Sequence, residues 1–121
     1  MMDCLAVGAG GFMGAVLRYL IGLAPLESVS GFPYKTFAIN LIGALMIGLI
    51  VGLAARHSSL SPRLVLFLKV GICGGFTTFS SFALETSDLL RAGSAPTAAF
   101  YAMLSMGLGV AAVLAGQQIA A

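Results

Sequence analysis

Charged side chains are scarce in this chain of 121 residues: only 8% of them are charged, whereas 60% are hydrophobic. An ordinary soluble domain is about 25% charged, and a small one needs that polarity because much of its surface stays wet. The high hydrophobicity also excludes a disordered chain. A net charge of +2 without a basic cluster leaves no footprint for nucleic acid, so we expect no nucleic-acid partner. The composition is that of a small integral membrane protein.

Cysteine and histidine are also rare, with two Cys and one His. Cys4 and Cys73 both lie in apolar runs, and neither has a second Cys or a His at metal-ligand spacing. We interpret both as small residues that pack between helices.

Four apolar segments are long enough to cross a bilayer, whose hydrocarbon core takes about 20 residues as a helix. They cover residues 4–24, 36–55, 64–84 and 96–119, with Gly, Pro, Ser and charged residues between them. The sequence therefore predicts an all-α integral membrane protein, with residues 1–121 as a single membrane domain. Four spans place both termini on one side of the membrane.

The basic residues do not favour either side of the membrane. Cytoplasmic loops normally attract Lys and Arg, yet three basic residues fall on each side: Arg56, Arg63 and Lys69 against Arg18, Lys35 and Arg91. In a short chain this balance can arise by chance. It is also typical of dual topology, in which copies insert both ways and pair as an antiparallel homodimer, and we favour that interpretation.

Pairs of glycines at four-residue spacing occur in three spans: Gly10 with Gly14, Gly48 with Gly52, and Gly71 with Gly75. Small residues at this spacing let membrane helices approach closely. We expect most of these glycines to lie at helix contacts.

Residues 71–82 (GICGGFTTFSSF) form the most informative stretch, because glycines and hydroxyl residues fall in the middle of a span. We predict a helix break near Gly74–Gly75, which membrane proteins tolerate only where protein or a cavity satisfies the freed backbone groups. Freed carbonyls can bind a cation, and freed N–H groups and hydroxyls can bind an anion. Phe79 and Phe82 share a helix face, and their positive ring edges can contact an anion; two core phenylalanines are the alternative.

Several other polar residues lie within the spans, and two of them allow two interpretations each. Arg18 is either an interfacial anchor or an attraction for anions near a pore mouth. Asn40 either bonds a neighbouring helix or donates an N–H to an anion. Tyr101 and Ser105, four residues apart, form a short polar stripe on the fourth span, which can form hydrogen bonds between helices. We interpret Lys69 as an anchor that extends to the membrane surface.

Together these residues make the chain resemble the Fluc (CrcB) family of fluoride channels. The matching pieces are residues 10–19 (GGFMGAVLRY), Asn40 with Gly43 and Gly48, residues 74–82 (GGFTTFSSF) with Glu85, and Tyr101 with Ser105. They cover essentially the whole chain in the right order.

The resemblance implies a dual-topology homodimer with two antiparallel fluoride pathways. It also implies a structural sodium ion at the dimer centre, held by the backbone carbonyls of Gly74 and Thr77. The residues carried over to the anion pathway are Asn40, Phe79, Ser80, Phe82, Tyr101 and Ser105, and those carried over to a pore vestibule or a structural role are Arg18 and Glu85. Ser81 stands where many relatives have Thr, which keeps the hydroxyl, and Gly109 stands where the hydroxyl track often continues in the family.

The resulting hypothesis is a fluoride-selective channel for passive export across a bacterial plasma (inner) membrane, with no enzymatic chemistry. Such a channel lowers cytoplasmic fluoride and its toxicity. A small multidrug-resistance-type proton-coupled exporter shares the size and the four spans, but it needs a carboxylate buried in span one. Span one has only Asp3, at its start, so we place this exporter second.

Overall fold

The computed structural model describes residues 1–121 as an all-helical chain without strands. Four helical spans are long and apolar enough to cross a membrane: Met2–Gly22, Tyr34–Arg56, Pro62–Arg91 and Ala95–Ile119. These correspond to α1 (Met2–Gly22), α2 (Tyr34–Arg56), a composite third span, and α6 (Ala95–Ile119). The prediction of four membrane-spanning helices is confirmed.

The third span is a succession of four helical segments: α3 (Pro62–Leu66), the π-helical η1 (Phe67–Cys73), α4 (Gly74–Phe76) and α5 (Phe79–Arg91). It begins where the Ser61 hydroxyl accepts a hydrogen bond from the Leu64 amide (3.1 Å) and Pro62 occupies the first turn.

The break in this span lies at Thr77 and Thr78, slightly beyond the predicted position near Gly74–Gly75. Thr77 (φ −77°, ψ 157°) and Thr78 (φ −149°, ψ 115°) are both extended, whereas Gly74 (φ −64°, ψ −37°) is helical. The prediction of a break is correct, but the glycines do not make it. Gly75 serves close packing instead, because a Cβ on it would lie 2.9 Å from the Gly11 Cα atom, whereas a Cβ on Gly74 would meet nothing within 4 Å.

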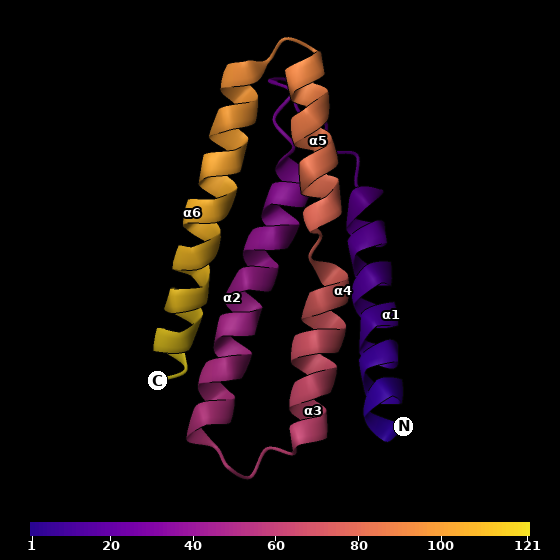
Figure 1. The fold of residues 1–121 in the computed structure, drawn as a ribbon, viewed down its shortest axis with the longest axis vertical. Coiled ribbons are helices and arrows are strands. Elements are labelled where there is room, and N and C mark those ends of the chain that lie inside the picture. The colour runs from indigo at the N-terminus through magenta and orange to yellow at the C-terminus, as the bar shows by residue number, and fades with distance from the viewer.

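The helices run alternately up and down, so that both termini lie at the same end of the molecule, as expected for four spans (Figure 1). α2 packs along α6, and α1 packs along η1 and α4. α5 continues beyond the break and contacts α6 near the opposite end (Figure 1).

Glycines and small residues form the two main helix contacts, as the spacing predicted. A Cβ on Gly71 would lie 2.8 Å from the Gly10 Cα atom, so α1 and η1 touch backbone to backbone. On the other side, a Cβ on Gly48 would lie 3.0 Å from the Val113 Cα atom, and one on Gly116 would lie 2.7 Å from the Leu49 amide nitrogen. Cys73 is buried among these helices, but Cys4 is exposed, so our packing interpretation is wrong for Cys4.

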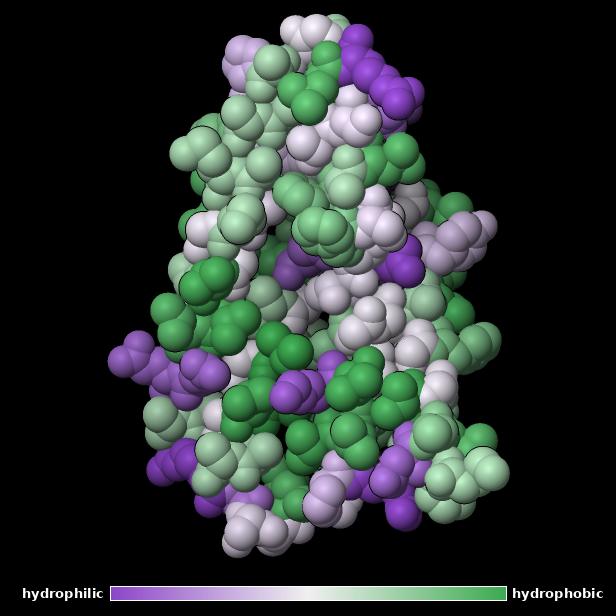
Figure 2. Space-filling view, in the orientation of Figure 1, coloured by the Kyte–Doolittle hydropathy of each residue, from purple (hydrophilic) through white to green (hydrophobic).

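The outer surface is strongly apolar. Only 14 of 121 residues are buried, and large hydrophobic side chains such as Phe12, Leu17 and Met103 are exposed. Figure 2 shows hydrophobic residues over the middle of the molecule, with hydrophilic ones near both ends and in isolated patches between. A soluble monomer rarely exposes so much apolar area. In a membrane these side chains contact lipid tails, which are equally apolar.

Candidate functional site

The extended residues at the break are held by their own hydroxyl groups. Thr78 is the N-cap of α5, and its Oγ1 accepts a hydrogen bond from the Ser81 amide (3.1 Å). Thr77 Oγ1 donates to the Cys73 carbonyl (2.8 Å), which closes the end of α4. Capping explains why a new helix starts here, since an N-cap threonine accepts a hydrogen bond from a backbone amide of the first helical turn. Sequence reasoning missed the cap, although Thr78 precedes a helical run and carried the signal.

Asn40 of α2 holds the break from the side. Its Oδ1 accepts from the Thr78 amide (2.8 Å), and its Nδ2 donates to the Thr78 carbonyl (3.1 Å). One amide side chain therefore replaces both hydrogen bonds that the extended backbone of Thr78 loses. Of the two interpretations of Asn40, the structure shows the hydrogen bond to a neighbouring helix. The second N–H of Nδ2 has no protein acceptor.

Backbone carbonyls are freed by this arrangement. In a continuous α-helix the Thr78 amide would bond the Gly74 carbonyl, but it donates to Asn40 instead. The Thr77 carbonyl accepts no hydrogen bond from backbone or side chain. The Gly75 carbonyl, in contrast, accepts a bond from Arg18 Nε (3.3 Å). The carbonyl oxygens of Gly74 and Thr77 are thus free to accept a hydrogen bond or to coordinate a cation.

A groove of about 370 Å³ runs along the break and brings together six of the residues selected from the sequence. Four belong to the expected anion pathway and two to the expected sodium site: Asn40, Phe79, Phe82 and Ser105, with Gly74 and Thr77. The rings of Phe79 and Phe82 have centroids 5.7 Å apart and planes tilted by 46°. Phe79 is 79% exposed and turns its ring outward, which leaves it free to meet a ligand or a partner.

Ser105 carries an unpaired polar atom in this groove. Its Oγ is buried and has no hydrogen-bond partner. Buried hydroxyls are normally bonded, because an unmade bond costs about 1–3 kcal/mol. A hydroxyl that lines a groove and lacks a protein partner is available to a ligand or water.

Glu85, which we associated with a pore vestibule, lies at the centre of a separate polar cluster. Tyr101 donates its hydroxyl to Glu85 Oε2 (2.7 Å), and Thr36 donates to Glu85 Oε1. This cluster ties α2, α5 and α6 together beside a pocket of about 180 Å³ at the first loop, which Glu85 and Lys35 line. Sequence reasoning missed Thr36, which lies one turn before Asn40 on the same face of α2.

The remaining selected residues do not line the groove. Tyr101 is fully buried behind Phe82, with ring centroids 5.1 Å apart. Arg18 lies on α1, bonded to the Gly75 carbonyl behind the break. Ser80 is exposed at the start of α5, with its Oγ 3.3 Å from Thr78 Oγ1.

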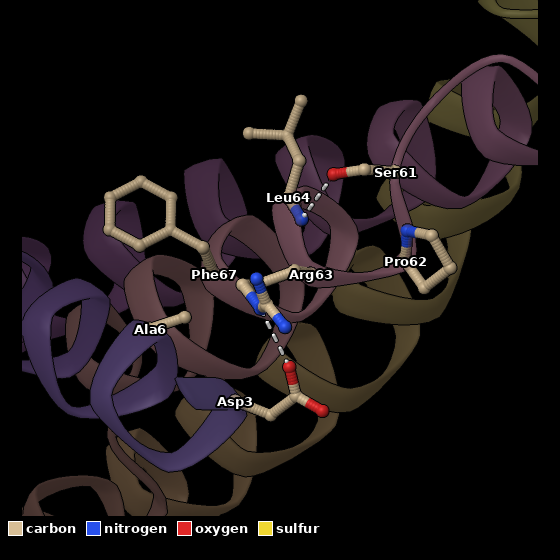
Figure 3. A pocket seen from close by; sticks show the side chains of 7 residues that line it. All are labelled: Asp3, Ala6, Ser61, Pro62, Arg63, Leu64 and Phe67. Carbon is tan, nitrogen blue, oxygen red and sulfur yellow. Dashed lines mark hydrogen bonds and ion pairs between the residues drawn. The ribbon is translucent and has the colours of Figure 1, made fainter. Parts of the chain in front are cut away.

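A larger pocket of about 630 Å³ lies at the end of the molecule that holds the termini (Figure 3). It contains an exposed ion pair between Arg63 Nε and Asp3 Oδ1 (2.9 Å), which joins the starts of α1 and α3. It holds none of the selected site residues. Exposed pairs of this kind contribute little to stability, so we regard this pocket as an open helix end.

Comparison with known proteins gives a consistent result. The family model described as "CrcB-like protein, Camphor Resistance (CrcB)" matches residues 5–117. A relative from Chlorobaculum tepidum, named fluoride-specific ion channel FluC, is 48% identical over 120 residues, covering 99% of this chain and 95% of the relative. Proteins of the same name from Agrobacterium fabrum (42% identical; 96% of this chain, 94% of the relative) and Nitrobacter winogradskyi (47%; 95% and 92%) are similarly close.

Proposed function

The chain belongs to the CrcB family of membrane proteins, and from this membership we propose that it is a fluoride-selective ion channel for passive fluoride export. Its curated relatives carry the name of fluoride-specific ion channels over nearly their whole length. A channel protein is not an enzyme, and no covalent step is required of any side chain. The observation that carries the proposal is the groove in which Asn40, Phe79, Phe82 and Ser105 meet at the helix break.

The chemistry of these groups suits a small, strongly hydrated anion. A pore must replace the hydration shell with donors, yet hold the ion weakly enough to release it. The buried Ser105 hydroxyl has no protein partner, and Asn40 has one N–H left over. The ring edges of Phe79 and Phe82 carry partial positive charge. Neutral donors of this kind attract fluoride without trapping it. In this role Ser80 supports the Thr78 cap, and Tyr101 extends the hydroxyl track behind Phe82.

We further infer that two copies pair as an antiparallel homodimer with dual topology. The even distribution of basic residues supports insertion in both orientations. The exposed Phe79 ring and the open groove support a partner surface, because an unpaired chain would leave the polar lining facing lipid. We place the protein in the plasma (inner) membrane of a bacterium, as a multi-pass protein.

A sodium ion suits the freed carbonyls. Hard cations prefer oxygen ligands, and Gly74 and Thr77 would supply two of them from each copy. The described chain has no cluster of three or more His, Cys, Asp or Glu for another kind of metal. Bound sodium would neutralise the carbonyl dipoles and hold the two breaks together. It would have no role as a carrier of fluoride.

The proton-coupled drug exporter finds less support. Glu85 is the carboxylate farthest from a span end, six residues before Arg91, and two hydroxyls already hold it. The groove contains no acidic side chain that could exchange a proton for a drug cation.

Fluoride efflux from liposomes tests the proposal directly. Purified protein is reconstituted into fluoride-loaded vesicles, with matched chloride-loaded vesicles, and release is recorded with ion-selective electrodes. We expect rapid fluoride release, little chloride release, and loss of fluoride release in Phe79→Ile. The matched control is Phe12→Ile, since Phe12 is 72% exposed but lies on α1 away from the groove. Absence of fluoride release from folded wild-type protein would overturn the proposal.

A further inference from the structure

Lys69 is the only charged residue among the 14 that line the groove. The sequence suggested an anchor at a helix end, but Lys69 lies in η1, seven residues after Pro62 at the start of the span. At 1.5 Å per residue it is roughly 10 Å along the span, so its Cα lies deeper than an anchoring residue at a helix end. The groove therefore carries one positive charge and no negative one.

The ammonium group of Lys69 has no protein partner. Neither a hydrogen bond nor an ion pair to its Nζ is present, whereas Lys35 donates to the Gly22 carbonyl and Arg63 pairs with Asp3. A charge within a span is costly unless it faces protein or a wet cavity. The side chain of Lys69 is exposed, and the groove provides that wet surface.

The position of Lys69 within the groove is at one end. The break at Thr77 is eight residues further along the chain, roughly 12 Å away along the span. Val113 of α6, which also lines the groove, lies six residues before the C-terminal end of its helix at Ile119. Anions that enter from this end meet Lys69 before they reach the donors at the break.

We propose that Lys69 attracts anions into the groove and thereby sets the fluoride flux at low fluoride concentration. This inference rests on the proposed channel function and deepens it. A cleft with a single sign of charge and apolar walls raises the local concentration of counter-ions. Because the ammonium group is exposed and hydrated, it attracts fluoride without binding it tightly, and the neutral donors beyond it complete the dehydration.

The test compares initial rates of fluoride efflux for wild type, Lys69→Gln, Lys69→Arg and Arg91→Gln. Arg91 is the matched control, since it is exposed at the far end of α5 and does not line the groove. Rates are measured at an ionic strength of about 10 mM and about 500 mM, adjusted with potassium glutamate at constant sodium. Screening lengths are about 30 Å and a few ångströms under these conditions, so the difference in rate between wild type and Lys69→Gln depends on ionic strength only if it is electrostatic.

For Lys69→Gln we expect a roughly three- to tenfold lower rate at low ionic strength, and less than about a twofold difference at high ionic strength. Lys69→Arg and Arg91→Gln should both match wild type. A Lys69→Gln rate that equals wild type, or that falls equally at both ionic strengths, would overturn the inference and leave an anchoring role. If Lys69→Gln does not fold, a wild-type rate that is insensitive to ionic strength overturns it equally. Wild-type protein that releases no fluoride would instead contradict the channel function itself.

Discussion

Replacement of Asn40 by alanine should loosen the helix break and stop the channel. The side chain makes two hydrogen bonds, to the amide (2.8 Å) and to the carbonyl (3.1 Å) of Thr78. In Asn40→Ala both backbone groups lose their partner at the point where α4 ends and α5 begins. No other side chain of the structure bonds either group.

The expected loss of stability follows from these two bonds. A hydrogen bond contributes about 1 kcal/mol net, and a buried group left without a partner costs about 1–3 kcal/mol. Thr78 is only partly buried and lines the groove, so water can replace part of what is lost. We therefore expect Asn40→Ala to lower the free energy of unfolding by about 2–4 kcal/mol. A domain of this size would lose about 10 °C in its unfolding midpoint.

Labelling of Cys73 by a thiol-reactive dye measures this loss. Cys73 is 2% exposed and reacts only when the helices separate, while the exposed Cys4 is first replaced by serine. The dye signal is followed during a thermal ramp in mild detergent, and fluoride efflux is recorded in liposomes. Ile42→Ala is the matched control, because Ile42 lies on the same helix but is 48% exposed on the apolar surface.

Asn40→Asp separates the two bonds. Aspartate still accepts from the Thr78 amide, but it turns an oxygen toward the Thr78 carbonyl and adds a negative charge to the groove. We expect stability between that of wild type and Asn40→Ala, with fluoride efflux abolished. If Asn40→Ala unfolds and conducts like wild type, the break does not depend on Asn40, and the reasoning is refuted.

Two further substitutions test the packing and the polar cluster. Gly75→Ala should destabilise the protein by about 1–3 kcal/mol, because the new Cβ would lie 2.9 Å from the Gly11 Cα atom; Gly8→Ala, with nothing within 4 Å, should be harmless in the same Cys73 assay. Equal midpoints for the two would contradict the close contact. Tyr101→Phe removes the hydroxyl that bonds Glu85 (2.7 Å) while the ring stays in place, so we expect a loss of about 1.5–3 kcal/mol and slower fluoride efflux. An unchanged midpoint would mean that water replaces the hydroxyl.

Much of the architecture follows from composition and local pattern. Ten charged residues among 121 require a lipid environment, and four long apolar runs fix the number of spans. Small residues at four-residue spacing marked the helix contacts, because only glycine permits the backbone approach of Gly10 to Gly71. Six of the 14 groove residues were also selected from the sequence, chiefly because hydroxyl and aromatic residues in mid-span have no role in an ordinary membrane helix.

Tertiary structure decided where the helix break lies and which residues line the groove. Gly74 and Gly75 looked like the break, but the break lies at Thr77 and Thr78 because Asn40, 38 positions earlier in the chain, bonds the Thr78 backbone. Lys69 looked like an anchor until the packing of four other helical segments, α2, α4, α5 and α6, placed the groove beside it. Spacing along one helix defines a face, but the partner of that face depends on contacts between distant segments. The sequence by itself thus determined the membrane class, the spans and the candidate residues, and only the packing of the helices decided which of them share a groove.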